Sequence, residues 1–133
     1  MVTLEKFLMG RDKKYPLTEE QKQNAEDMVR RINSLLALFG QSRAINSGYR
    51  PPEVNASTPG AAKRSKHMEC NAGDIEDADG ALDAWCMANL DKLAEIGLWL
   101  EHPSGTRTPK RFGHGWCHVQ RVPPRSGNRV FYP

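Results

Sequence analysis

The chain has 133 residues, a length that fits one domain of the common class of roughly 100 to 150 residues, so we expect a single domain over residues 1–133. Hydrophobic residues make up 38% of the chain, which is enough for one modest core and argues against global disorder. The formal charge of +3 is compatible with an anionic partner such as cell wall or nucleic acid, but it does not indicate which.

The cysteines and the amino-terminal segment bear on where the protein is made. The three cysteines are odd in number and include no C-x-x-C pair, which argues against a disulfide framework and a thiolate zinc knuckle. The segment MVTLEKFLMGRDKKYP lacks the unbroken apolar region of a signal peptide, and no run approaches the ~20 apolar residues of a membrane span. We therefore expect a monomeric protein that is synthesised in the cytoplasm without membrane insertion.

The first expected element is a long helix. Thr18 followed by Gln21 has the form of a capping box. Apolar residues then recur at helical spacing as far as Phe39, and Gly40 would end the helix. Residues 43–55 begin like a short strand and then break into a loop at a glycine and a proline pair.

The second half of the chain predicts strands around one further helix. Residues 74–76 have the pattern of a strand start, after which Asp79 could cap a helix that ends at Gly97. Three more strands are expected, at residues 97–101, 116–120 and 129–132. Together these elements predict an α+β fold in which helices pack on an antiparallel sheet.

Basic residues gather in three short groups along the chain. They are Lys63, Arg64 and Lys66; Arg107, Lys110 and Arg111; and Arg121, Arg125 and Arg129. Such groups are either solvated loop charges or a rim that receives an acidic polymer, and the sequence leaves both interpretations open. A nucleic-acid partner is not favoured, because the chain has no recognisable helix-turn-helix, aromatic stacking motif or concentrated basic helix.

The densest chemical signal is the segment SKHMECNAGD, residues 65–74. It places His67 and Asp74 seven residues apart, and an imidazole and a carboxylate are both zinc ligands by type. A catalytic zinc commonly takes three protein ligands and leaves its fourth position to water. The sequence therefore needs one more ligand.

His118 is the best candidate for this third ligand. Side chains alternate along a strand, so Trp116, His118 and Gln120 would share one face of the strand predicted at residues 116–120. Cys117 would then lie on the opposite face as a buried core thiol. Taken alone, a histidine in a strand could also be a satisfied structural residue.

At these positions the chain resembles the zinc D-alanyl-D-alanine carboxypeptidases and L-alanyl-D-glutamate endopeptidases, relatives of the hedgehog amino-terminal domain. The family pattern S-x-H-x-x-G-x-A-x-D is matched by Ser65, His67, Ala72 and Asp74. Cys70 stands where the family has Gly. The SGYRP segment and the downstream W-x-H strand match as well, so that the resemblance, with the leading helix, covers nearly the whole chain.

The resemblance implies a zinc ion (Zn2+) held by His67, Asp74 and His118. It also implies that Arg50, in the SGYRP segment, contacts a substrate carboxylate, for which a bidentate guanidinium is well suited. The alternative for Arg50 is a structural salt bridge. Ser65 would orient a ligand or the substrate near the metal, or it is a simple turn hydroxyl.

The catalytic base is the least settled role in this resemblance. Many members of the family carry Glu or Asp three residues before the last histidine, but that position here is Gly115. Other relatives place a Glu on the preceding strand, and Glu101 occupies the matching place, where it would take a proton from water. His102 and His114 are weaker candidates that could instead donate a hydrogen bond to the developing oxyanion. The alternative for Glu101 is a surface carboxylate at a strand end.

The function that the resemblance implies is zinc-dependent cleavage of peptidoglycan stem peptides. L-alanyl-D-glutamate endopeptidase activity in phage-type lysis is the first expectation, with the enzyme reaching the wall from the host cytoplasm once a membrane pore opens. A D-Ala-D-Ala carboxypeptidase is the second, because the sequence does not give the pocket shape. A non-catalytic zinc-containing cell-wall-binding module is the alternative from another class, and the missing acid at Gly115 supports it.

Overall fold

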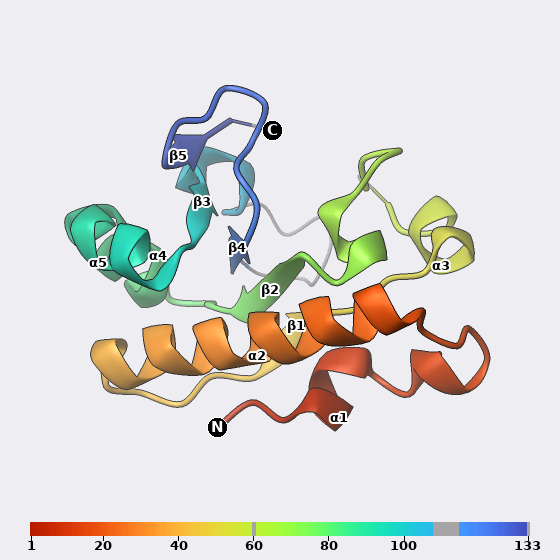
Figure 1. Cartoon of the computed structure of the whole chain (residues 1–133). Helices are drawn as coiled ribbons and strands as arrows, with labels where there is room; N and C mark the ends of the chain where they lie inside the picture. Colours follow the sequence, from red (N-terminus) through yellow and green to blue (C-terminus); the bar gives the residue numbers. More distant parts are fainter. Residues whose placement is uncertain (60, 108–114, 133) are drawn as a thin grey trace.

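A five-stranded sheet organises the part of the chain that this computed structural model describes, which is residues 1–59, 61–107 and 115–132. In sheet order the strands are β1 (Ile45–Ser47), β2 (Ala72–Glu76), β4 (Trp116–Gln120), β3 (Trp99–Glu101) and β5 (Val130–Phe131). The α-helices are α1 (Leu4–Leu8), α2 (Glu19–Phe39), α3 (Pro52–Ala56), α4 (Ala81–Ala88) and α5 (Leu90–Ile96). Figure 1 shows α1 and α2 below β2, with α4 and α5 on one side of the sheet and α3 on the other. The α+β class is confirmed.

The strand pairing differs from the expected antiparallel sheet at one edge. Neighbours among β1, β2, β4 and β3 run antiparallel, but β5 pairs with β3 in parallel, so the sheet is mixed. The backbone N–H groups of Leu100 and His102 donate to the carbonyl oxygens of Arg129 and Phe131 along this edge. A strand of two residues carries no pattern that reveals its direction, so only the folded chain could decide it.

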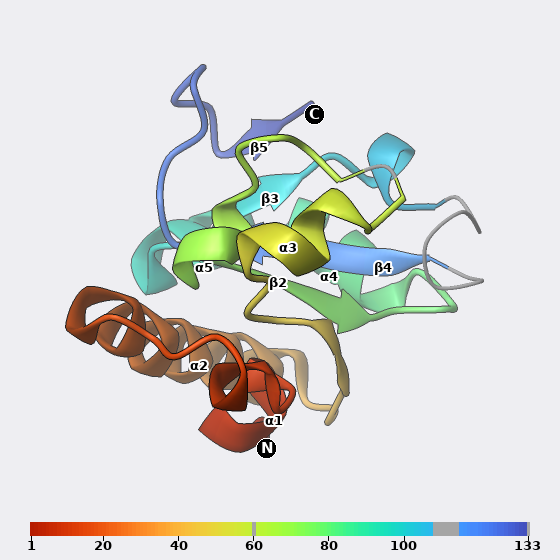
Figure 2. The same cartoon turned by 90° about the vertical axis from the view of Figure 1, so that its right-hand side faces the viewer.

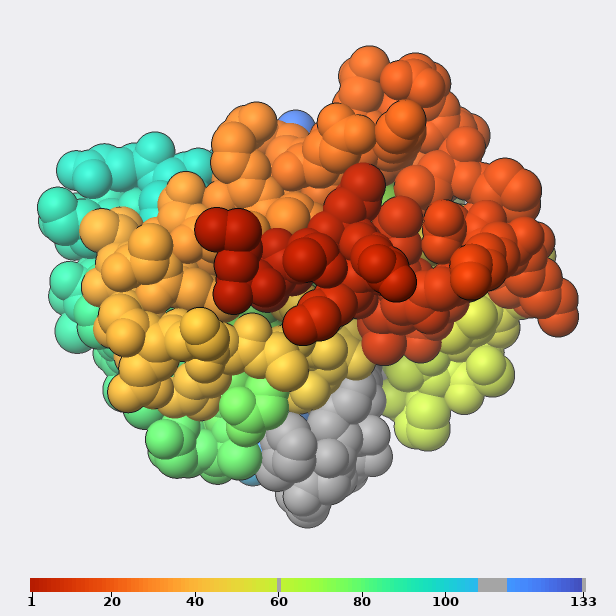
Figure 3. All heavy atoms as spheres, turned by 90° about the horizontal axis from the view of Figure 1, so that it is seen from below, coloured from red at the N-terminus to blue at the C-terminus, as the bar shows by residue number. Residues whose placement is uncertain are grey.

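The long helix α2 forms as predicted. Thr18 and Gln21 make both hydrogen bonds of the capping box, and Gly40 ends the helix in the left-handed conformation at φ 87°. Its apolar stripe is buried in the core, with Met28 and Ile32 fully shielded from solvent. Figure 3 shows α1 and α2 covering the face of the molecule seen from below. Among the described residues, no helix combines the length and the apolar character that crossing a bilayer requires.

The helix expected between Asp79 and Gly97 is interrupted, so the prediction of one continuous helix was wrong. Asn89 separates α4 from α5 with φ −133° and ψ 44°, which lie outside the helical region. Its side-chain amide donates to the backbone oxygen of Trp85 at 2.8 Å. An asparagine side chain that bonds to the preceding turn offers the backbone an alternative to the helix, and the apolar spacing on either side does not reveal it.

A short helix lies where a loop was expected after β1. The helix α3 begins at Pro52, and proline is tolerated at the first helical position because its missing N–H would have no partner there. Asn55, in the last turn of α3, donates its side-chain amide to the backbone oxygen of Ala62 at 2.7 Å. This contact ties the helix to the segment that leads toward residue 67.

Replacement of Gly48 by alanine is expected to destabilise the protein by about 3 kcal/mol, at the upper end of the range for overpacking. A Cβ atom on Gly48 would overlap the backbone oxygen of Phe7, which cannot move as the tip of a side chain can. Urea unfolding followed by circular dichroism measures the change. Gly127→Ala is the control, because Gly127 has open space around its Cβ position and only its φ of 76° opposes alanine. Equal stability of the two variants would contradict this prediction.

Candidate metal centre and active site

Strands β2 and β4 place Asp74 and His118 directly opposite each other. The two residues are partners in the antiparallel register, so their side chains project from the same face of the sheet. His118 Nδ1 lies 2.8 Å from Asp74 Oδ1. Cys117 and Val119 lie fully buried in the core, as the alternation along the strand predicts.

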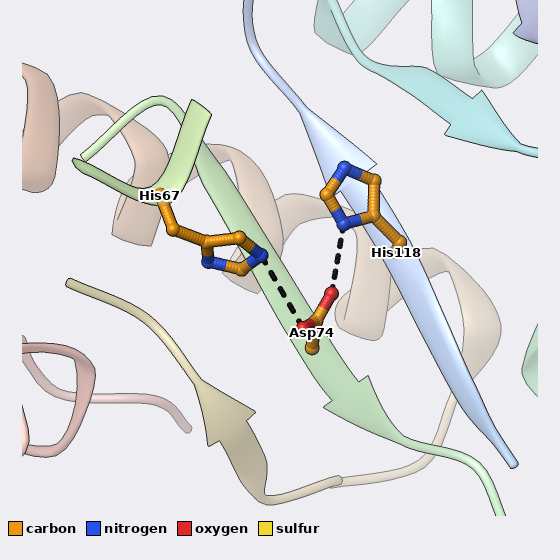
Figure 4. Close-up of side chains that lie close together, drawn as sticks. All are labelled: His67, Asp74 and His118. Carbon is orange, nitrogen blue, oxygen red and sulfur yellow. Dashed lines mark hydrogen bonds and ion pairs between the residues drawn. The ribbon is translucent and has the colours of Figure 1, made fainter. Parts of the chain in front are cut away.

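His67 reaches the same point from a separate element, the 3-10 helix η2 (Lys66–Glu69). Its ring Nδ1 lies 2.9 Å from the backbone oxygen of Gly48, and a carbonyl oxygen only accepts, so Nδ1 carries the proton. The other ring nitrogen, Nε2, therefore presents its lone pair, and it lies 3.3 Å from Asp74 Oδ2. Figure 4 shows both rings pointing at the one carboxylate from two sides.

Gln120 determines the corresponding orientation of His118. The side-chain amide of Gln120 donates to the backbone oxygen of Val122 at 2.9 Å, which leaves its Oε1 3.1 Å from His118 Nε2. His118 Nε2 therefore donates to Gln120, and Nδ1 is the nitrogen that faces Asp74. Strand alternation in the sequence predicts that Gln120 lies on this face, but it does not predict a role for the residue.

The three side chains form a group that fits a divalent metal ion. One possible ligand atom from each of His67, Asp74 and His118 lies within 4.8 Å of the others, and all three residues are buried. His67 Nε2 is also buried without a hydrogen-bond partner among the described residues. A buried polar atom that lacks a hydrogen bond is costly, and a metal ion in the group would satisfy it.

The electrostatics of the group favour an ionised carboxylate beside a neutral imidazole, which are the forms that ligate zinc. Burial alone would raise the pKa of Asp74, but the neighbouring rings of His67 and His118 outweigh it and hold that pKa well below its usual range. Burial lowers the pKa of His67. Burial also lowers the pKa of His118, but the hydrogen bond to Asp74 and the charge of that carboxylate outweigh burial, so the pKa of His118 is raised overall.

Arg50 lies behind the group and is only 2% exposed. Its Nη2 is 3.4 Å from Asp74 Oδ2, and its Nη1 donates to Asn55 Oδ1 at 3.2 Å. Its backbone N–H donates to the carbonyl of His67. These contacts favour the structural alternative for Arg50, in which its guanidinium fixes the position of the Asp74 carboxylate, although the residue also lines the cavity described next.

A cavity of about 500 Å³ opens over the group, and His67, His118 and Glu101 all lie in its wall. Glu101 is half-buried at the end of β3. The register pairs Leu100 with Val119, so one residue further along sets Glu101 opposite His118. The charge of Glu101 also contributes to the raised pKa of His118, as expected of a near neighbour. The structure therefore brings the expected base and the two expected histidine ligands to one cavity, while Asp74 lies buried between the two rings.

The remaining candidates have more local roles or lie elsewhere. Ser65 lines the cavity, and its Oγ accepts the backbone N–H of His67 at 3.2 Å, so it orients η2 as a turn hydroxyl does. His102 Nδ1 accepts the backbone N–H of Ser104 at 3.1 Å, and its ring stacks on that of Tyr132. His102 is not part of the cavity wall. His114 lies outside the described residues.

Cys70, which stands where the related family has Gly, ends η2 in the left-handed conformation at φ 61°. Glycine adopts this conformation without strain, which explains the preference of the family at this position. Burial raises the pKa of the Cys70 thiol to about 12. The thiol is therefore protonated at neutral pH, and it is not a member of the group of His67, Asp74 and His118.

Two imidazoles and a carboxylate converging beneath a cavity that also holds a second carboxylate define a candidate metallohydrolase. A sequence model of the family described as Peptidase M15 matches residues 6–102, which is most of the chain. The chain therefore belongs to the peptidase M15 family and is a zinc-dependent metallopeptidase. The matched region ends before His118, so the assignment of His118 to the metal-binding group rests on the geometry. No curated protein and no solved structure matches the chain.

Proposed function

We propose that this zinc peptidase hydrolyses the stem peptides of bacterial peptidoglycan, and that the bond cleaved joins L-alanine to D-glutamate. The observation that carries the proposal is the convergence of His67, Asp74 and His118 beneath a cavity that also contains Glu101. Membership of the M15 family supports peptidoglycan as the substrate class. A role in phage-type lysis stays a prediction of the resemblance.

In this proposal the zinc is held by His67 Nε2, Asp74 and His118 Nδ1. Bound zinc supplies a Lewis acid that activates water and polarises the scissile carbonyl. Glu101 takes the proton of the attacking water and passes it to the leaving amine. Arg50 orients the Asp74 carboxylate through its contact at 3.4 Å.

Gln120 acts in this proposal as a positioning residue for His118, and Gln120→Leu is expected to weaken zinc binding by about 10 to 100-fold. Leucine cannot accept a hydrogen bond from His118 Nε2–H, so the ring is free to adopt the other tautomer. Competition with a chromogenic chelator measures the zinc affinity directly, without reference to activity.

Two further variants sharpen this test. Gln120→Glu keeps an acceptor for Nε2 and is expected to retain most of the affinity. Gln23→Leu makes the same chemical change at an exposed position of α2 and is expected to leave affinity unchanged. Unaltered zinc affinity in Gln120→Leu would remove the positioning role.

Mass spectrometry of purified peptidoglycan, incubated with the protein with and without a chelator, tests the proposed function. Fragments separated between L-alanine and D-glutamate, formed only without chelator, are the expected result. Release of terminal D-alanine alone would identify a D-Ala-D-Ala carboxypeptidase instead. Unchanged muropeptides in the presence of zinc-loaded protein would contradict the enzyme and favour a non-catalytic wall-binding module.

A further inference from the structure

Six residues of the basic groups separate into two sets in the folded chain, whereas Lys63 is exposed and does not line the cavity, and Lys110 and Arg111 lie outside the described residues. Three arginines are engaged by the body of the protein, where they hold elements together. Their contacts are Arg107 with Asp83 at 3.1 Å, Arg121 with Asp27 at 2.7 Å, and Arg129 over the ring of Trp99 at 4.4 Å. These partly shielded side chains are ion-paired or stacked within the protein and do not line the cavity, so neither of the two interpretations that the sequence left open describes them.

Arg64, Lys66 and Arg125 form the second set, which we call the cationic wall. All three are exposed, and all three line the cavity that contains His67 and His118. Within residues 1–59, 61–107 and 115–132, no side-chain hydrogen bond or ion pair engages any of these three cations. Among the described residues of the cavity lining, the acidic one is Glu101.

The cationic wall is assembled from two distant parts of the chain. Arg64 precedes η2 and Lys66 begins it, whereas Arg125 follows β4, and side chains from both segments line the cavity. The two segments are separate stretches of backbone in Figures 1 and 2. Cations with no acidic partner that gather around one cavity raise its electrostatic potential and attract an anion. Arginine also offers a planar fork that matches a carboxylate. The buried Arg50 is already held by Asp74, so the cationic wall is better placed to meet a substrate anion.

We propose that the cationic wall binds a free carboxylate of the stem peptide beside the scissile bond. This inference rests on the proposed function and names the substrate feature that the site selects. When D-glutamate is joined to the next residue through its side-chain carboxyl, its α-carboxyl stays free and lies next to the bond with L-alanine. The enzyme therefore prefers stem peptides with this carboxyl free over stem peptides in which it is amidated.

Two synthetic stem peptides, identical except for a free or an amidated α-carboxyl on D-glutamate, test the proposal. The zinc-loaded parent is expected to hydrolyse the acidic peptide with a kcat/KM about tenfold higher. Arg64→Gln combined with Arg125→Gln is expected to raise KM for the acidic peptide about tenfold, to leave kcat little changed, and to abolish the preference. Lys63→Gln is the matched control, because Lys63 is an exposed neighbour of Arg64 that does not line the cavity.

The outcomes separate this inference from the proposed function. Equal hydrolysis of the two peptides by the parent would overturn the inference and leave the peptidase proposal standing. Hydrolysis of neither peptide would overturn both. The double variant could also bind intact anionic cell walls less tightly and still hydrolyse the acidic peptide as the parent does. This result would overturn the inference, because the cationic wall would then bind a phosphate of a wall polymer and not the peptide carboxylate. Zinc content and circular dichroism of each variant exclude a loss of fold as the cause.

Discussion

His118→Ala is expected to lose its zinc and to hydrolyse peptidoglycan more than about 1,000-fold more slowly than the parent. His118 Nδ1 lies 2.8 Å from Asp74 Oδ1, so its removal leaves two of the three ligands and opens the site to solvent. A Lewis acid contributes several kcal/mol of transition-state stabilisation, and each 1.4 kcal/mol corresponds to a tenfold change in rate. Elemental analysis of the purified variant and turbidity of a cell-wall suspension measure the two effects.

His102→Ala controls for the loss of an imidazole, because His102 lies outside the cavity wall. Its zinc content and activity are expected to match those of the parent. Asp74→Asn is a second variant for the case in which His118→Ala folds poorly. It keeps the shape of a side chain that is fully buried but removes the charge between the two rings, and zinc loss is expected here too. Stoichiometric zinc in folded His118→Ala would refute the ligand assignment.

Glu101→Gln is expected to lower kcat by about 100 to 10,000-fold while zinc and fold are retained. The amide keeps the shape of Glu101 in the cavity wall but cannot accept the proton of the attacking water. Because Glu101 is not among the three metal-binding candidates, elemental analysis is expected to find parental zinc. Initial rates on a stem peptide, measured across pH, give the decrease in kcat. They also show whether the acidic limb of the pH–rate profile, where the base becomes protonated, has disappeared.

Glu95→Gln provides the matched control for this variant, because Glu95 is an exposed carboxylate on α5 with no place in the cavity wall. Its kcat is expected to equal that of the parent. A Glu101→Gln enzyme with parental kcat would eliminate Glu101 as the base. Loss of zinc from Glu101→Gln would instead indicate that this carboxylate supports the metal site, as a ligand or through His118.

Local sequence patterns predicted those parts of the fold that depend on neighbouring residues alone. The capping box at Thr18 and Gln21 and the stop at Gly40 bound α2 as expected, because each involves hydrogen bonds within a few residues. The alternation in β4 likewise separated His118 and Gln120 from the core residues Cys117 and Val119. In contrast, Asn89 breaks a helix inside an unbroken apolar pattern, and β5 pairs in a direction that no pattern encodes.

The candidate site shows the same division between local and long-range information. The sequence by itself determined the kinds of side chain available for a metal, His67, Asp74 and His118, because ligand chemistry is a property of residue type. Only the tertiary structure decided which ring nitrogens face Asp74, since a carbonyl and an amide fix them from outside the group. It also decided which cations pair within the body and which line the cavity, because burial and partners arise where distant segments meet.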